Sequence, residues 1–216
     1  MAELRTGAYG QYYGCYMYES HALTQAQMEV NARYIYSALT AQGWTPEAIA
    51  GILGNMQWES SINPGRWQSD NVNALSSGYS LVQWTPARNY IEWCEGRGYD
   101  PSEMDVALLR IRYELSNGLQ YYATPGYPLS FREFTQSKES PYYLACAFAW
   151  NYERSHTVLY GTEAEKEALR QKRGNSAQGW YKVITGMDPT PPPVTPSTNK
   201  HKMSLLLMWA ATRRKI

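Results

Sequence analysis

The sequence is poor in the residues that build metal, thiol and serine-nucleophile sites. Its 216 residues include only three Cys and three His. The Cys residues lie far apart with no C-x-x-C pair, so we expect three buried free thiols, with a single disulfide as the alternative. The His residues show no H-x-H or H-E-x-x-H pattern, and no G-x-S-x-G occurs. We therefore expect no metal and no cofactor. If the protein is an enzyme, the residues that remain for acid–base catalysis are Asp and Glu carboxylates.

Long hydrophobic runs are also missing. The apolar run at residues 203–211 is too short to span a bilayer, and residues 1–20 lack the apolar core of a signal peptide. Residues 1–188 carry 15 Lys and Arg against 19 Asp and Glu, a net charge of −4. A mildly acidic body argues against nucleic acid as the main partner. We expect a globular protein with no transmembrane segment, no signal peptide and no nucleic-acid partner.

Tyrosine and tryptophan are abundant, with 19 Tyr and 8 Trp against 3 Phe. Rings with a polar tip are common on ligand-facing surfaces, and their faces can stack on sugars. A tyrosine-rich core is an equally ordinary explanation. The aromatic composition therefore fits a glycan-binding protein without requiring one.

Composition and helix signals divide the chain into four parts. Residues 1–23 are predicted to be an extended, Tyr-rich arm, and residues 24–186 a mainly helical body. Residues 187–200 are a Pro-rich linker, and residues 201–216 a short apolar and basic peptide. This last segment could dock on a partner or an anionic surface, or could be a disordered tail.

The body is predicted to be α+β and mainly α, with no βαβ alternation and no internal repeat. Between the second and third helices, residues 61–84 are rich in Asn, Ser and Gly and predict an irregular β region with one or two hairpin turns. The last helix is expected to be interrupted near Gly174. Helices are predicted at about residues 24–41, 45–60, 86–96, 100–117, 130–137, 141–154 and 162–184, the fourth from the start signature Asp100-Pro101-x-Glu103.

The helix at residues 45–60 has strong start signals and carries a carboxylate at its end. Thr45 suits the N-cap position and Pro46 the first helical position. Ile49, Ile52, Leu53 and Met56 form one apolar stripe, and Glu59 falls on the same side. Low dielectric and the negative helix pole would raise the pKa of a carboxyl there, as a general acid needs. The alternative is an ordinary solvated surface glutamate.

The residues after Glu59 resemble a known enzyme family. The chain has E-S-x-x-N-P from Glu59 and G-x-S-L-V-Q-W-T from Gly78. This pair resembles the catalytic region of goose-type lysozymes and soluble lytic transglycosylases. The W-E-S and S-L-V-Q-W-T-P-A-R wording is most similar to the phage tail lysozyme family, the cell-wall-cutting domain of tail-tip proteins. The resemblance covers residues 24–184 and implies a lysozyme-like fold with a small β-hairpin region after the catalytic helix.

The resemblance also implies roles for single residues. Glu59 would be the catalytic acid that protonates the glycosidic oxygen, and Asp70 is the candidate second carboxylate, with a turn-forming role as the alternative. For Glu153, in the W-N-Y-E-R segment, a structural Glu–Arg pair is at least as good an explanation as a place in the cleft beside Tyr152. Asn63 is expected to shape the cleft. The expected substrate-binding residues are Gln83, Tyr79, Ser80, Trp84, Asn63 and Tyr152.

The function implied is cleavage of the β-1,4 bond between N-acetylmuramic acid (MurNAc) and N-acetylglucosamine (GlcNAc) in peptidoglycan. We expect the protein on a virion, at the phage tail tip, or on a related contractile device. Other tail proteins would then be partners, through the N-terminal arm or the C-terminal peptide. Two alternatives stay open: a lytic transglycosylase that forms 1,6-anhydro-MurNAc ends, and a structural tail protein that binds glycan without cutting it.

Overall fold

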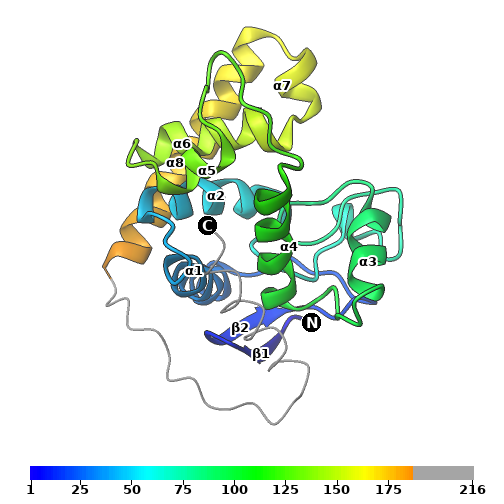
Figure 1. Ribbon diagram of the computed structural model, residues 1–216. Coiled ribbons are helices and arrows are strands. Elements are labelled where there is room, and N and C mark those ends of the chain that lie inside the picture. Colours follow the sequence, from blue (N-terminus) through cyan, green and yellow to red (C-terminus); the bar gives the residue numbers. More distant parts are fainter. Residues whose placement is uncertain (187–216) are drawn as a thin grey trace.

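The computed structural model describes residues 1–186, which form a mainly helical body with one small sheet, so the predicted fold class is confirmed (Figure 1). The predicted linker at 187–200 and peptide at 201–216 lie outside the described residues. None of the described helices is long and apolar enough to cross a membrane. The α-helices are α1 (Gln25–Thr40), α2 (Pro46–Ser60), α3 (Ala87–Glu95), α4 (Met104–Asn117), α5 (Phe131–Gln136), α6 (Pro141–Phe148), α7 (His156–Tyr160) and α8 (Glu163–Thr185).

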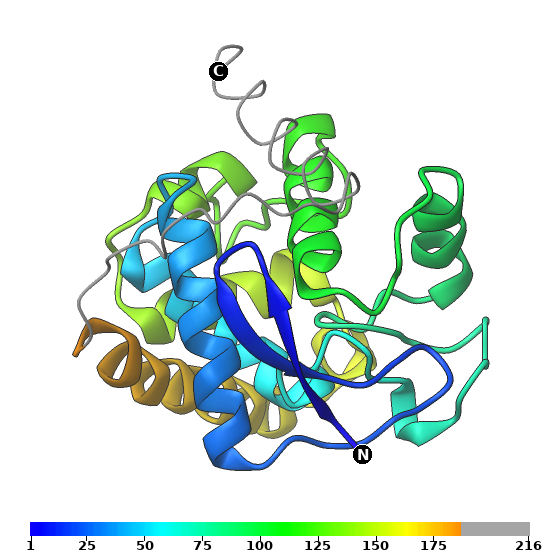
Figure 2. The ribbon, with the colours of Figure 1, turned by 90° about the horizontal axis from the view of Figure 1, so that it is seen from below.

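Helix α2 lies at the centre of the helical body, with α6 and α8 packed on it and α1 on another side (Figures 1 and 2). Two glycines allow this close packing. A Cβ at Gly51 would lie 2.9 Å from the side chain of Leu144 on α6, and one at Gly54 would lie 2.7 Å from the carbonyl oxygen of Arg173 on α8. A larger residue at either position would push the neighbouring helix away. The glycines therefore fix how closely α8 approaches the end of α2.

The predicted N-terminal arm is a β-hairpin attached to the body. Strand β1 (Glu3–Gly7) pairs antiparallel with β2 (Gly10–Gly14), and Tyr12 is buried. Arg5 donates a hydrogen bond to the carbonyl oxygen of Ser102, and the amide of Ala8 donates to the carboxylate of Asp105 at 2.9 Å. The first strand is thus fixed to the start of α4. The predicted extended arm is thus a local hairpin, and the residues that hold it against the body lie far along the chain.

The irregular segment after α2 contains no named strand and little regular structure. The regular structure within residues 61–86 consists of a short 3-10 helix, η1 (Gln68–Asp70), and two isolated antiparallel bridges. The bridges pair Trp67 with Tyr79 and Tyr79 with Trp84. Residues with positive φ interrupt any longer ladder. They are Ser61, Ile62, Ser69, Asp70, Asn73, Ser80 and Gln83. The β region predicted after the catalytic helix is therefore reduced to two bridges, and the two-stranded sheet lies at the N-terminus instead.

Three helix predictions need correction. Helix α4 begins at Met104 and not at the predicted signature from Asp100, because Asp100 accepts a hydrogen bond from the amide of Ser102 at 2.8 Å and holds a turn ahead of the helix. Helix α8 is continuous through Gly174, because the ring of Tyr142 occupies the space that a Cβ would need and packing holds the backbone helical. The segment 141–154 is not one helix: α6 ends at Phe148 and continues as a π-helix, η2 (Ala149–Glu153), which stops at Arg154 with a φ of 45°. The three cysteines are free and buried, as predicted.

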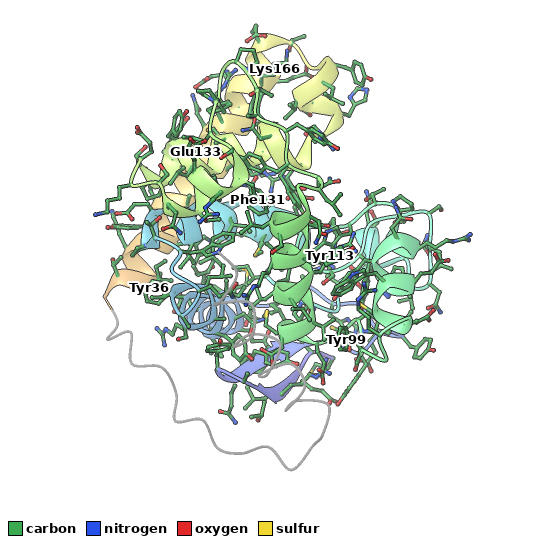
Figure 3. The ribbon with its side chains drawn as sticks, in the orientation of Figure 1. Tyr36, Tyr99, Tyr113, Phe131, Glu133 and Lys166 are labelled. Atoms are coloured by element: carbon green, nitrogen blue, oxygen red, sulfur yellow. The ribbon has the colours of Figure 1, made fainter. Side chains whose placement is uncertain are left out.

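Part of the aromatic content is explained by packing between α3 and α4. The ring centroid of Trp93 lies 5.9 Å from that of Tyr99 and 5.4 Å from that of Tyr113. Figure 3 marks Tyr113 on α4 and Tyr99 on the loop that leads into it. The guanidinium of Arg97 lies over the Trp93 ring at 4.7 Å. These rings hold α3 against α4 and do not need a ligand to account for them.

Candidate active site

Helix α2 ends abruptly and is tied to the loop that carries Gln83. Ser61 and Ile62 both adopt left-handed φ values, 55° and 53°, which turn the chain away from the helix axis. The Ser60 hydroxyl donates to the carbonyl oxygens of Met56 and Leu81, the latter at 2.9 Å. The end of the helix and residues 78–85 are therefore held in one fixed relation.

Asn63 fastens the N-terminal segment beneath this helix end. Its Oδ1 accepts hydrogen bonds from the amides of Cys15, at 3.2 Å, and Gly65, at 2.9 Å. Its Nδ2 donates to the carbonyl oxygen of His21 at 2.8 Å. The side chain is fully buried. These contacts agree with a shaping role, while a contact of Asn63 with substrate stays a prediction.

Glu59 lies in the last turn of α2, where its carboxylate meets a guanidinium from α8. The four apolar residues of the predicted stripe are fully buried, and the Glu59 side chain keeps 21% of its surface exposed. Arg173 donates to Oε1 of Glu59 and, through its other terminal nitrogen, to the carbonyl oxygen of Asn55 at 2.7 Å. Sequence spacing gave no sign of this arginine, because it lies on α8 and reaches Glu59 only through the close approach at Gly54.

A buried carboxylate on α4 gathers three other residues of the site. Glu114 accepts hydrogen bonds from the Trp84 indole at 2.9 Å, from Arg110 Nε at 2.9 Å and from the Tyr152 hydroxyl. Burial raises the pKa of Glu114, and the donors from Tyr152, Arg110 and Trp84 act in the opposite direction. Glu114 thus joins the loop after the bridges to η2, and the sequence pattern did not single it out.

A cavity of about 290 Å³ opens between the 82–85 loop and η2. Three predicted substrate-binding residues line it, namely Gln83, Trp84 and Tyr152. Glu153 lines it as well. Arg154, the sequence neighbour expected to pair with Glu153, instead places its guanidinium 4.5 Å from the ring of Tyr122. The remaining lining residues are Val82, Thr85, Gln120, Arg154 and Leu159.

Gln83 is held in a strained backbone conformation at the edge of this cavity. Its φ is 50°, and its Nε2 donates to the carbonyl oxygens of Arg66 and Ser80, both at 3.0 Å. Its Oε1 is buried and accepts no hydrogen bond from the described part of the chain. Tyr79 and Ser80 are fully buried and do not line the cavity, so substrate contact by these two residues stays a prediction.

Asp70 is bound by its own loop. Arg66 Nε lies 2.8 Å from Oδ1 of Asp70, and the Ser20 hydroxyl donates to the same oxygen at 2.6 Å. The Asp70 side chain is 48% exposed and does not line the cavity. Within residues 1–186 no hydrogen bond or ion pair joins Asp70 to Glu59. Its role as the second carboxylate therefore stays a prediction, and its observed contacts stabilise the turn.

Across the described residues, no group of three His, Cys, Asp or Glu side chains is placed to hold a metal ion. The structure instead pairs the carboxylate of Glu59 with the guanidinium of Arg173, and it places a second carboxyl group, that of Glu153, in the wall of the cavity. Gln83, Trp84 and Tyr152 line the same wall, whereas Glu59 is not among the residues that line the cavity. Such a set can hold and move protons and can hydrogen-bond to a polar chain of sugars.

Comparison with known proteins finds similarity to a protein family and to a phage protein. The family model described as phage tail lysozyme matches residues 30–184. Morphogenesis protein 1 of Bacillus phage B103 is 40% identical to the chain over 168 residues, which cover 78% of this chain and 43% of that relative. The chain thus spans less than half the length of this relative.

Proposed function

Because this chain belongs to the phage tail lysozyme family, we propose that it degrades bacterial peptidoglycan by hydrolysing the β-1,4 bond between MurNAc and GlcNAc. The proposal is carried by the position of Glu59 within a chain that the family model matches over residues 30–184. Glu59 belongs to the E-S-x-x-N-P motif and lies at the end of α2, which is hydrogen-bonded to the loop that contains Gln83. The family and the phage relative also support a place on the virion, in or near the tail.

In the proposed reaction Glu59 is the general acid. It protonates the glycosidic oxygen while positive charge builds on the sugar ring, and the bond between that oxygen and the anomeric carbon breaks. Its exposed fraction of 21% leaves the carboxyl accessible from one side, while Arg173 holds the other. Water then adds to the anomeric carbon and yields a reducing end, and the proton that this water releases restores the acid form of Glu59.

The cavity wall supplies the contacts with the glycan in this proposal. Gln83 lines the cavity, and the carbonyl oxygens of Arg66 and Ser80 hold its Nε2 in place, so in this proposal it forms a fixed part of the wall along which the glycan lies. Tyr152 and Trp84 are fixed by Glu114 and present rigid walls. A preorganised wall reduces the entropy lost when a sugar chain is bound.

Clearing of purified peptidoglycan by the wild type, by Glu59→Gln and by Glu47→Gln tests the function. Glu47 is the matched control, because it lies on the same helix, and its carboxylate accepts a hydrogen bond from the Tyr181 hydroxyl at 3.3 Å. General acids contribute roughly 10²- to 10⁴-fold to rate, so we expect Glu59→Gln to lose at least about 100-fold and Glu47→Gln to stay within about threefold of wild type.

The products of the same digestion decide between the chemistries. Mass spectrometry is expected to find reducing MurNAc ends, and 1,6-anhydro-MurNAc ends would replace the hydrolase with a lytic transglycosylase. If the wild type clears nothing between roughly pH 4 and pH 8, the protein binds glycan without cutting it, and the proposed activity is wrong.

A further inference from the structure

Three residues in the wall of the cavity adopt a backbone conformation that long side chains rarely take. Gln83, Gln120 and Arg154 have φ values of 50°, 66° and 45°, and all three line the cavity. A residue with a Cβ is strained in this left-handed region, so it stays there only where the surrounding structure holds it. Such residues are concentrated at binding sites and active sites. Their grouping here indicates that the wall is shaped to present polar side chains to a ligand.

Hydrogen bonds to η2 hold the loop that contains Gln120 and Tyr122. The side chain of Gln120 donates to the carbonyl oxygen of Tyr152 at 3.2 Å, and the amide of Tyr122 donates to that of Asn151 at 2.9 Å. The buried Asn151 side chain accepts hydrogen bonds from the amide and the hydroxyl of Thr124, at 3.1 Å and 2.8 Å. The loop and η2 therefore keep one arrangement, in which the ring of Tyr122 has a fixed position although the residue is 58% exposed.

The guanidinium of Arg154 lies over this ring and has no acidic partner among the described residues. Its central carbon is 4.5 Å from the centroid of the Tyr122 ring. Within residues 1–186 no hydrogen bond or ion pair involves a nitrogen of this guanidinium, and none of these nitrogens is fully buried. Arg154 also lines the cavity. Its N–H groups are therefore available to a molecule bound there.

The neighbouring carboxyl group of Glu153 does not compensate this charge. Burial raises the pKa of Glu153 well above its ordinary value, which favours the uncharged form. The charges that act on that carboxyl group come from α2, α8 and α4, and not from Arg154. Within residues 1–186 the positive charge in this part of the wall is thus unpaired, and it favours an anionic group in the ligand.

A guanidinium that lies over an aromatic ring suits a carboxylate. Contact with the ring uses the face of the guanidinium and leaves its edge free for two parallel hydrogen bonds to a carboxylate. The ring also fixes the plane of the guanidinium, so less side-chain entropy is lost on binding. In peptidoglycan the carboxylates are carried by the substituents of MurNAc, namely the lactyl group where no peptide is attached and the peptide where one is. The alternating sugar backbone itself is uncharged.

We propose that Arg154, held over Tyr122, binds a carboxylate carried by a MurNAc unit of the bound strand, on either its lactyl group or the attached peptide. The inference rests on the proposed function and names the part of the substrate that this wall selects. Arg154 is a substrate-binding residue, and it neither transfers a proton nor forms a covalent bond. Its contact favours strands with an anionic substituent over neutral strands of the same sugars.

The kinetic test uses three preparations of the same glycan strands. The first carries intact peptides, the second has been freed of peptides by an amidase, and in the third the freed lactyl carboxylates have been converted to neutral methylamides. The measured quantity is kcat/KM on each charged preparation divided by kcat/KM on the neutral one. In Arg154→Gln we expect this ratio to fall at least about tenfold, mainly through KM, because a hydrogen bond to a charged group is lost. Arg154→Lys, which keeps the charge without the planar fork, should recover part of the ratio.

The control for this test is Arg132→Gln, at an exposed position on α5 outside the cavity, and it should keep the wild-type ratio. A fall with intact strands assigns the contact to the peptide, and a fall with freed strands assigns it to the lactyl group. A purely structural role for Arg154 would lower kcat/KM by the same factor on all three preparations. That result overturns the proposal, and so do unchanged ratios for both charged preparations.

Binding without cleavage separates this inference from the proposed function. The Glu59→Gln variant is titrated with a GlcNAc–MurNAc tetrasaccharide, with the same tetrasaccharide carrying peptides, and with neutral chitotetraose, while nitrogen-15 NMR follows the Nε–H group of Arg154. We expect a charged tetrasaccharide to shift this signal and to bind less tightly as salt rises, because the contact is ionic. That result supports the inference even if the wild type digests nothing. If chitotetraose shifts the signal equally, or no tetrasaccharide shifts it, the inference is wrong even if the wild type digests peptidoglycan.

Discussion

The contacts of Asn63 predict that replacing this residue in the E-S-x-x-N-P motif affects stability far more than chemistry. Asn63→Ala removes the acceptor for the amides of Cys15 and Gly65 and the donor to the carbonyl oxygen of His21. All three partners are backbone groups, and the site is fully buried. Water cannot readily replace the lost side chain there.

The size of the effect follows from these three hydrogen bonds. Each contributes about 1 kcal/mol net, and a buried backbone group left without a partner costs about 1–3 kcal/mol. Since neighbouring groups relax in part, we expect the free energy of unfolding to fall by about 3–4 kcal/mol. For a domain of this size each kcal/mol lowers Tm by roughly 2–4 °C, so the expected drop is roughly 6–16 °C.

Thermal unfolding followed by far-ultraviolet circular dichroism measures this drop. Asn117→Ala is the matched control, because Asn117 donates one hydrogen bond, to the carbonyl oxygen of Tyr113, at an exposed helix end. It should lose less than about 1 kcal/mol. Well below both Tm values, Asn63→Ala should clear peptidoglycan at close to the wild-type rate. A Tm equal to that of the control would show that Asn63 does not stabilise the loop. A folded variant with about tenfold lower activity would show that Asn63 acts on the substrate.

Two further outcomes follow from packing and burial. Gly54→Ala should lower the free energy of unfolding by about 1–3 kcal/mol, because its Cβ meets the backbone of α8. Gly179→Ala has open space around its Cβ, so its stability should be unchanged or higher by up to about 1 kcal/mol. Equal Tm values for the two variants in thermal unfolding would contradict this expectation. Burial raises the pKa of Cys94 to about 12 and that of Cys146 to about 11, so both thiols stay protonated at about pH 8. We expect them to react with a disulfide reagent only after the protein unfolds. Fast reaction of these two thiols in the native protein would refute this expectation.

The starts of α1, α2 and α8 could be predicted because the signals that fix them are local. Thr24 and Thr162 form capping boxes with the residues three positions on, and Thr45 caps α2 ahead of Pro46. A side chain that bonds to an amide three residues away needs no knowledge of the rest of the fold. The interruption predicted at Gly174 failed for the converse reason. The prediction there rested only on the low helix propensity of Gly, whereas the packing of the Tyr142 ring against Gly174 keeps the backbone helical.

The candidate site could be predicted only along single segments. Helical spacing put Glu59 on the side of the buried stripe, but its partner Arg173 lies 114 positions away. The W-N-Y-E-R segment pointed to Tyr152, but its hydrogen-bond partner Glu114 lies on α4. Propensity and periodicity describe one element at a time, whereas these contacts join elements that are packed together.

The N-terminal hairpin has a consequence for the order in which the chain can fold. Arg5 and Ala8 bond to residues 97 positions further along, at the start of α4. During synthesis these strands emerge well before their partners, which follow only after the whole of α1, α2 and α3. Contacts of such sequence separation form late, because a long loop must close before they stabilise anything. We therefore expect the hairpin to be made before the helices that anchor it but to become fixed late, and we expect the end of α2 to gain its support from Cys15 only at that stage.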